Sequence, residues 1–365
     1  MRISDIPSSA YTIWGRTIPE ISPLTLFWSG SGIEIAVKCS EMYMSFRTDY
    51  SSCEQWIAVL VNGAFISRQM LPKGECRVCL FRGMTSDKVK TVQIIKEVQA
   101  MGDDPAAILQ IIDIEHDGEF AVLKPHKYNI EVIGDSISSG EGSIGAKQEE
   151  DWIPMFFSAV YEYGMVTGRN LDARVNIVSQ SGWGLTSGWD NDNRHIIPPH
   201  YRNVCSVLNG QMNESLGVMK EYDFAGGVDA VIINLGTNDC GALDQPEFVN
   251  PETGERFKQQ RNDDGTLSDA TRNRIENGVI SFLEEVRECN PGAYIVWVLG
   301  MLGNYLNPYV ENALDNYKKK SGDTRVAFLA LEDTNDKNVG ARSHPGKLCH
   351  EQAAERITSF LEGVL

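Results

Sequence analysis

Four short segments of this 365-residue chain carry the residue types that acyl transfer requires. Ser136 follows the apolar run IEVI in a Gly-Asp-Ser turn, Gly182 lies in SQSGWGL, Asn238 lies in GTND, and His344 lies in SHP near the C-terminus. A serine hydroxyl is a weak nucleophile until a base takes its proton, and histidine is the usual base. We therefore predict that Ser136 is the nucleophile and that His344 is its general base.

The same segments offer hydrogen-bond donors for the oxyanion that forms when a serine attacks an ester. The predicted donors are the backbone N–H groups of Ser136 and Gly182 and the side-chain amide of Asn238. Gly184, in the same segment as Gly182, is an alternative to it. Each residue also has an ordinary structural role available, with Ser136 as a helix N-cap and Asn238 as a turn residue. The presence of all four segments in one chain favours catalysis.

A parallel sheet is needed to bring these segments together. From about residue 125 onward, the apolar runs YNIEVIGDS, ARVNIVSQSG, VDAVIINLGTND and AYIVWVLGM alternate with amphipathic helical segments. This alternation is typical of a three-layer α/β/α domain. Ligands of open α/β sheets bind beyond the carboxyl ends of the strands, which is where three of the four segments fall.

The first 125 residues are predicted to form a separate β-sandwich. Apolar residues at 33, 35, 37 and 39 follow the period of a half-buried strand, and several more short strands follow. The runs WIAVLV and AFISRQML flank Asn62-Gly63, the strongest short signal for a β-hairpin. The change of period near Pro125 divides the chain into predicted domains of residues 1–125 and 126–365.

Composition argues against several classes of function. The formal net charge of −17 would repel nucleic acid and anionic membranes. No window of about 18 apolar residues predicts a membrane span, and the N-terminus lacks the pattern of a secretory signal, which predicts a cytoplasmic protein. Cys76 and Cys79 form a lone C-x-x-C, and no paired-histidine motif is present. We therefore expect neither a metal nor another cofactor.

In their order along the chain, the four segments resemble the blocks of the SGNH (GDSL-like) hydrolase superfamily, which contribute Ser, Gly, Asn and His. Ser136, Gly182, Asn238 and His344 match these residues one by one, within roughly residues 126–365. The resemblance implies a serine ester hydrolase that works through an acyl-enzyme. The run GDSIS lacks the second glycine of the α/β-hydrolase elbow, which argues against that other fold.

A β-sandwich ahead of an SGNH domain is similar to carbohydrate esterase family 2, the acetyl (xylan) esterases with an N-terminal jelly roll. That resemblance implies removal of acetyl groups from hemicellulose-derived xylo- or manno-oligosaccharides without a metal. An SGNH esterase, lipase or thioesterase acting on a non-carbohydrate ester is the alternative enzyme. A carbohydrate-binding protein without activity is the alternative outside enzymes. The β domain then binds sugar, forms a wall of the site, or forms the interface of a homo-oligomer.

The third member of a catalytic triad is not evident. Many SGNH enzymes carry an aspartate three residues before the histidine, where this chain has Ala341. Either a backbone carbonyl orients His344, giving a Ser-His dyad, or Asp333 or Asp336 from the preceding loop completes a triad. We favour the dyad.

Aromatic residues near these segments are candidates for sugar contacts, because sugar rings pack their apolar faces on aromatic planes. Trp183 and Trp189 follow Gly182 closely, and Trp152 and Tyr305 are further candidates. Packing in the core is the alternative role for each of them.

Overall fold

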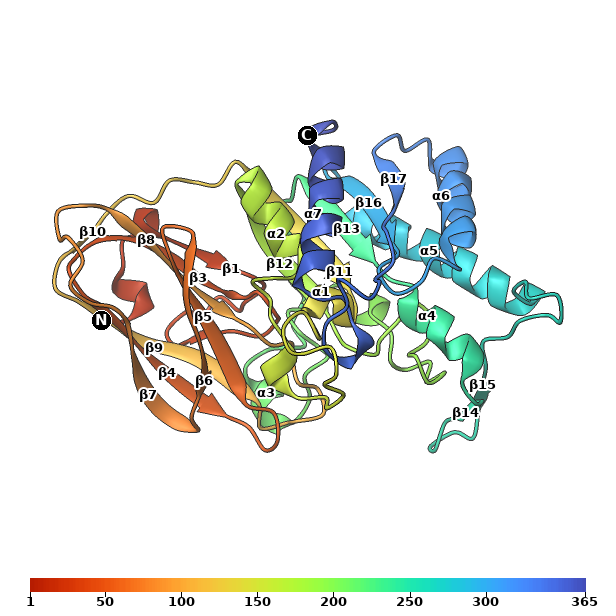
Figure 1. Cartoon of the computed structure of the whole chain (residues 1–365), viewed down its shortest axis with the longest axis horizontal. Coiled ribbons are helices and arrows are strands. Elements are labelled where there is room, and N and C mark those ends of the chain that lie inside the picture. The colour runs from red at the N-terminus through yellow and green to blue at the C-terminus, as the bar shows by residue number, and fades with distance from the viewer.

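The first ten strands form two antiparallel sheets in the computed structural model, which describes all 365 residues. One sheet has the order β1-β3-β8-β5-β6 with β10 beside β3, and the other has the order β2-β9-β4-β7. Figure 1 shows these strands gathered at one end of the molecule. Their bounds are β1 Tyr11–Trp14, β2 Leu24–Thr25, β3 Gly32–Lys38, β4 Met42–Asp49, β5 Gln55–Val61, β6 Ala64–Leu71, β7 Gly74–Phe81, β8 Lys90–Lys96, β9 Ile108–His116 and β10 Glu119–Phe120.

Apolar side chains from both sheets share one core, which confirms the predicted β-sandwich. Ile33 and Ile35 of β3 pack in the same cluster as Met44 and Phe46 of β4, and all four are fully or almost fully buried. The predicted hairpin is also present between β5 and β6. Asn62 and its glycine neighbour have φ angles of 52° and 76°, the left-handed values that this turn requires.

The rest of the chain builds a five-stranded parallel sheet with the order β12-β11-β13-β16-β17. The strands are β11 Tyr128–Gly134, β12 Ala173–Ser179, β13 Ala230–Asn234, β16 Tyr294–Leu299 and β17 Val326–Ala330, and a small hairpin pairs β14 Phe248–Val249 with β15 Arg256–Phe257. The helices are α1 Ser136–Ser139, α2 Tyr163–Leu171, α3 Gln211–Ser215, α4 Thr237–Gly241, α5 Asp269–Cys289, α6 Asn307–Ser321 and α7 Lys347–Glu362.

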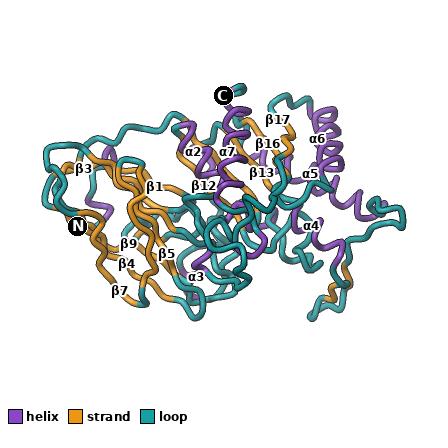
Figure 2. Tube along the Cα trace, in the orientation of Figure 1, coloured by secondary structure: helices purple, strands orange, loops and turns teal.

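Helices cover both faces of this sheet, as Figure 2 shows. Helices α2 and α7 pack together on one face, and α5 and α6 pack together on the other. Every residue of β13 is buried, because side chains on both faces of the strand meet a helical layer. The predicted α/β/α architecture is therefore confirmed. None of the helices combines the length and the apolar character that a membrane-spanning segment requires.

A buried ion pair joins the β-sandwich to the parallel sheet. Arg16, which follows β1, places its Nη2 2.9 Å from Oε1 of Glu131 in β11, and both side chains are almost completely buried. The Tyr201 hydroxyl donates to the other carboxylate oxygen of Glu131 at 2.6 Å. The Arg16 guanidinium also donates to the carbonyl of Asn203 at 2.9 Å. Every charged atom of the pair thus has a partner, which is the condition for burying charge.

Substitution of Arg16 by methionine is expected to lower the free energy of unfolding by about 3–5 kcal/mol, because it leaves the buried charge of Glu131 without its partner. Urea denaturation of the two proteins measures the difference. The control is Arg47→Met, which breaks an exposed pair with Glu75 and should leave stability almost unchanged. Equal stability of the Arg16 and Arg47 variants would contradict the assignment of this pair as a buried link between the sheets.

Candidate active site

The nucleophile segment begins where β11 ends. Asp135 caps α1 by accepting a hydrogen bond from the N–H of Ile137 at 3.0 Å, and Ser136 is the first residue of that helix. The backbone N–H of a residue at this position has no partner within the helix, so it is free to bind an anion. Gly134 is required here, because a Cβ would lie 2.0 Å from the Ser138 hydroxyl oxygen.

The structure brings Ser136 and His344 together from segments 208 residues apart. Nε2 of His344 lies 3.0 Å from Oγ of Ser136, and Nδ1 lies 2.9 Å from the carbonyl oxygen of Arg342. A carbonyl can only accept, so Nδ1 carries the proton and the lone pair of Nε2 faces the serine. This is the tautomer that a general base needs.

Neither predicted carboxylate lies beside His344. Asp333 accepts a hydrogen bond from the N–H of Gly303 at 2.8 Å. Asp336 forms an ion pair with Lys147 at 2.7 Å, and its side chain is 96% exposed. The physical reason is the path of the backbone between β17 and α7. It turns so that the carbonyl of Arg342 occupies the place on Nδ1 that a carboxylate would need.

Gly182 presents a free donor at the same site. Its φ angle is 79°, and its backbone N–H has no acceptor within the protein. Gly184 does not offer this, because its N–H already donates to the carbonyl of His195 at 3.1 Å. The geometry therefore favours Gly182 over the alternative glycine. The loop after Gly182 is held by Asp239, which accepts from the N–H groups of the three residues Leu185, Thr186 and Ser187.

Asn238, in α4, points its amide toward the nucleophile segment. Its Nδ2 donates to the carbonyl of Trp183 at 2.8 Å and to Oδ2 of Asp135 at 3.2 Å. Both N–H bonds thus have acceptors in the free site, so an oxyanion must share one of them, and the longer bond to Asp135 is the one more easily shared. Burial, together with the nearby charges of Asp239 and Glu141, raises the pKa of Asp135 to about 7.

The four predicted residues Ser136, Gly182, Asn238 and His344 line a single open cleft of about 1000 Å³. Three tryptophans line the same cleft, namely Trp152, Trp183 and Trp189. Trp189 is 52% exposed, so much of its surface is free for a ligand. Trp183 instead stacks on His195, with ring centroids 5.3 Å apart.

Tyr305 does not reach the cleft. Its hydroxyl donates to the carbonyl of Gly265 at 2.6 Å, and its ring packs near that of Tyr309. Its aromatic ring made it a candidate for sugar contacts from the sequence. Leu302, three residues earlier, lines the cleft, but the hydrogen bond to Gly265 holds the Tyr305 side chain outside the set of lining residues.

The β-sandwich contributes a wall of the cleft, which is one of the three roles that the sequence left open for it, but the residues of that wall were not predicted. Gln99, Met101 and Asp103, which follow β8, line it together with the four predicted residues. Oε1 of Gln99 accepts from the N–H of Ser181 at 2.8 Å, next to Gly182. The sequence holds no motif in this segment, so no signal there could have identified it.

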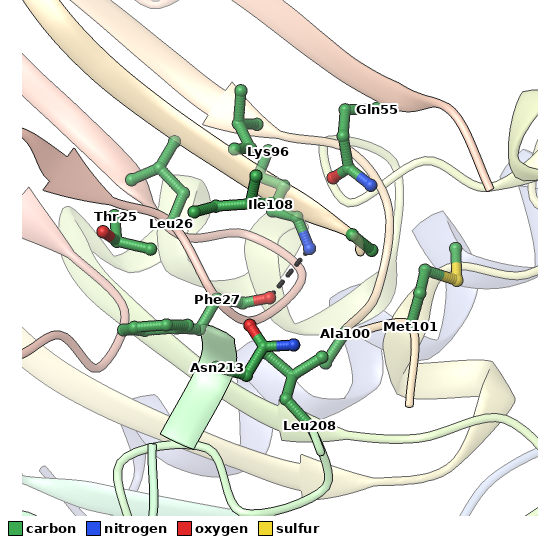
Figure 3. Close-up of a pocket in the computed structure, with 12 residues that line it drawn as sticks. Thr25, Leu26, Phe27, Gln55, Lys96, Ala100, Met101, Ile108, Leu208 and Asn213 are labelled. Carbon is green, nitrogen blue, oxygen red and sulfur yellow. Dashed lines mark hydrogen bonds between the residues drawn. The ribbon is translucent and has the colours of Figure 1, made fainter. Parts of the chain in front are cut away.

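A buried lysine anchors this wall. Nζ of Lys96 donates to the carbonyl oxygens of Phe27 at 2.7 Å and Gln99 at 2.8 Å, and Figure 3 shows the first of these bonds. Burial lowers the pKa of Lys96 to about 7. The void beside it has a volume of only about 10 Å³, so it is part of the packed contact between the sheets and no ligand site.

Residues 130–357 match the model of the GDSL-like lipase/acylhydrolase family. A cellulase/esterase from Acetivibrio thermocellus is 25% identical over 93% of this chain, and the chain spans 37% of that relative's length. An acetylxylan esterase/glucomannan deacetylase from Cellvibrio japonicus is 28% identical over 76% of each sequence.

Two solved structures share the whole architecture. An acetyl xylan esterase from the rumen bacterium Butyrivibrio proteoclasticus is 43% identical, with a TM-score of 0.97 over 100% of this chain and 98% of the other. A family two carbohydrate esterase from Clostridium thermocellum, solved with cellohexaose, is 23% identical, with a TM-score of 0.78 over 97% and 98% of the two chains. The chain therefore belongs to the GDSL-like lipase/acylhydrolase family, and its two-part fold is that of the family 2 carbohydrate esterases.

Proposed function

We propose that this protein is a serine O-acetyl esterase that removes acetyl groups from carbohydrate through a covalent acetyl-enzyme. The observation that carries the proposal is the 3.0 Å contact between Oγ of Ser136 and Nε2 of His344 at the wall of an open cleft. The cleft also holds unused or shareable donors on Gly182 and Asn238. Nucleophile, base and oxyanion donors are the three parts that acyl transfer needs.

The reaction follows from these positions. His344 takes the proton of Ser136 as the oxygen attacks the acetyl carbon, and the negative charge that develops on the carbonyl oxygen is bound by the N–H groups of Ser136 and Gly182 and by the Asn238 amide. The bond to the sugar oxygen then breaks, and this oxygen takes the proton from His344. Water, activated by His344, attacks the acetyl-serine and releases acetate, which restores the Ser136 hydroxyl.

The choice of carbohydrate as substrate rests on two kinds of support. The relatives at 43% and 28% identity are named for deacetylation of xylan and of glucomannan. The exposed indole of Trp189 beside the site offers a plane on which a sugar ring can pack. Acetylated xylo- or manno-oligosaccharides therefore fit best as substrates.

Acetate release from acetylated xylo- and manno-oligosaccharides tests the proposal, with aryl esters of increasing acyl length measured in parallel. We expect acetate from at least one oligosaccharide and a steep loss of rate beyond the shortest aryl esters. Hydrolysis of long acyl esters without acetate release would instead identify an esterase or lipase for a non-carbohydrate ester. Binding of the oligosaccharides without hydrolysis of any ester would identify a binding protein.

Replacement of Asn238 by alanine is expected to lower kcat about 100- to 1000-fold with little change in KM, because one donor to the oxyanion is lost only in the transition state. Initial rates on an aryl acetate measure both constants. A variant with unchanged kcat would show that the amide serves only its hydrogen bonds to Asp135 and Trp183.

We also propose a cytoplasmic location, where short imported oligosaccharides would be the substrates. The support is that all eight cysteines are free thiols in the structure, as is typical of proteins in a reducing compartment. Fractionation of the source cells tests this, and esterase recovered from the culture medium of intact cells would contradict it.

A further inference from the structure

Glu141 connects the nucleophile segment to the loop that carries His344. Its Oε1 accepts from Nε of Arg342 at 2.9 Å, and its side chain is only 3% exposed. Its backbone N–H donates to the carbonyl of Ser136 at 3.0 Å, so the residue belongs to the turn that ends α1. The same carboxylate oxygen lies 3.8 Å from Nε2 of His344. The buried carboxylate of Glu141 thus lies near the imidazole of His344 and also binds Arg342, whose carbonyl orients that imidazole.

The loop held by Glu141 has a strained backbone. Arg342 and Ser343 have φ angles of 54° and 56°, left-handed conformations that are unfavourable for residues other than glycine. Strain of this kind persists only where surrounding contacts impose it. Arg342 has three such contacts besides its carbonyl: the ion pair with Glu141, its N–H bonded to the carbonyl of Glu149 at 2.7 Å, and its Nη1 bonded to the carbonyl of Glu150 at 2.8 Å.

The two segments pack closely at this point. A Cβ on Gly142 would lie 2.3 Å from the carbonyl oxygen of Ala341 and 2.6 Å from Cβ of His344. The N–H of Ala341 donates to the carbonyl of Gly142 at 3.1 Å. The turn after α1 and the histidine loop are therefore closely packed, and the ion pair of Glu141 with Arg342 links their side chains beside the imidazole.

We propose that the ion pair of Glu141 with Arg342 does the work of the missing triad carboxylate. The pair fixes the Arg342 carbonyl on Nδ1 of His344, and the carboxylate of Glu141 stabilises the imidazolium that forms when His344 takes the serine proton. Both are positioning residues, because they act through His344 and neither exchanges a proton with the substrate. The inference rests on the proposed hydrolysis through Ser136 and His344.

The charges around His344 predict effects of opposite sign for the two partners. Glu141 Oε1 lies 3.8 Å from the imidazole and binds the Arg342 guanidinium, and His350 of α7 stays neutral because burial, together with the nearby His344, lowers its pKa to about 3. Asp135 bonds to Asn238 and makes no contact with the imidazole. Loss of the Glu141 charge therefore disfavours the imidazolium, whereas loss of the Arg342 charge favours it.

Kinetics of Glu141→Gln and Arg342→Ala against pH test the inference, with an aryl acetate as substrate. We expect kcat to fall about 10- to 100-fold in each variant, because the general base loses its orientation. KM should stay within about threefold of the wild-type value. The acid limb of kcat/KM should move to lower pH in Glu141→Gln and to higher pH in Arg342→Ala, by up to about one unit. The double variant should lose no more kcat than the slower single variant, because each single substitution already breaks the same ion pair.

The matched control is Glu285→Gln, which breaks a half-buried pair with Arg202 away from the cleft and should leave kcat and the pH profile unchanged. Wild-type kcat in both test variants would overturn the inference. Equal losses without a shift of the acid limb, or shifts of the same sign, would assign the pair a structural role only and overturn it as well. An inactive wild-type protein would instead refute the proposed hydrolysis itself.

The hydrogen bond between His344 and Arg342 can also be tested by NMR, without measuring activity. The proton on Nδ1 of His344, bonded to the Arg342 carbonyl at 2.9 Å, should give a downfield resonance in the proton NMR spectrum of the wild-type protein. We expect that resonance to be lost or broadened in Glu141→Gln and retained in Glu285→Gln. Retention of an unchanged resonance in Glu141→Gln would show that the ion pair does not hold the carbonyl in place.

Discussion

Replacement of Ser136 by alanine is expected to lower kcat for acetyl esters by a factor on the order of 10⁵, because it removes the oxygen that forms the covalent bond. KM should change little, since the cleft and its tryptophans remain. Initial rates on an aryl acetate and on an acetylated oligosaccharide measure the loss. The residual rate reflects binding and the oxyanion donors alone.

Ser138 provides the matched control, because it lies in the same short helix. Its hydroxyl is buried and bonded to that of Tyr163 at 2.7 Å, so Ser138→Ala removes a hydroxyl of the same kind that does not contact His344. We expect this variant to keep kcat within a few-fold of wild type. Comparable losses in the two variants would show that α1 as a whole had been disturbed and that Ser136 is not the nucleophile.

Replacement of His344 by alanine is expected to lower kcat by a factor on the order of 10⁴ to 10⁵, close to the loss from Ser136→Ala, because a serine without its base is a poor nucleophile. The variant that lacks both residues should be no slower than the worse single variant, since the two act as a unit. Rates of the two single variants and the double variant measure this. Losses that multiply would contradict the dyad.

The aspartates Asp333 and Asp336 supply the control for this prediction. Loss of the aspartate from a true triad costs about 10⁴ in kcat. Neither side chain contacts His344 in this structure, so we expect Asp333→Asn and Asp336→Asn to keep kcat within about twofold of wild type. A loss of several hundred-fold in either variant would show that the side chain reaches His344 during the reaction.

The four residues of the site could be predicted because each lies in a short sequence motif whose position relative to the nearest strand or helix can be recognised. Ser136, Gly182 and Asn238 each follow an apolar run that forms a strand of the parallel sheet, and parallel strands bring their carboxyl ends to one edge. The two architectures could be predicted for a similar reason. A period of two predicts a half-buried strand, and alternation of apolar strands with helices predicts a parallel sheet.

The partners of these residues could not be predicted, because they depend on the tertiary path of loops. Glu141 and Arg342 are 201 residues apart, and neither lies in a motif that pairs it with the other. Gln99 reaches the site only because the segment after β8 packs against the loop after β12. Asp333 and Asp336 were plausible third members of a triad because they are close to His344 along the chain. The left-handed backbone at Arg342 instead brings its carbonyl oxygen to Nδ1 of His344.

The most direct test of the central claim is the fate of the acetyl group when methanol competes with water. An acetylated xylo-oligosaccharide and an aryl acetate are supplied separately to the enzyme, and methyl acetate and acetate are both quantified. If both donors acetylate Ser136, they pass through the same intermediate, so the ratio of the two products must be the same for both and must vanish with Ser136→Ala. A ratio that differs between the donors, or that survives in Ser136→Ala, would contradict the acetyl-enzyme on Ser136.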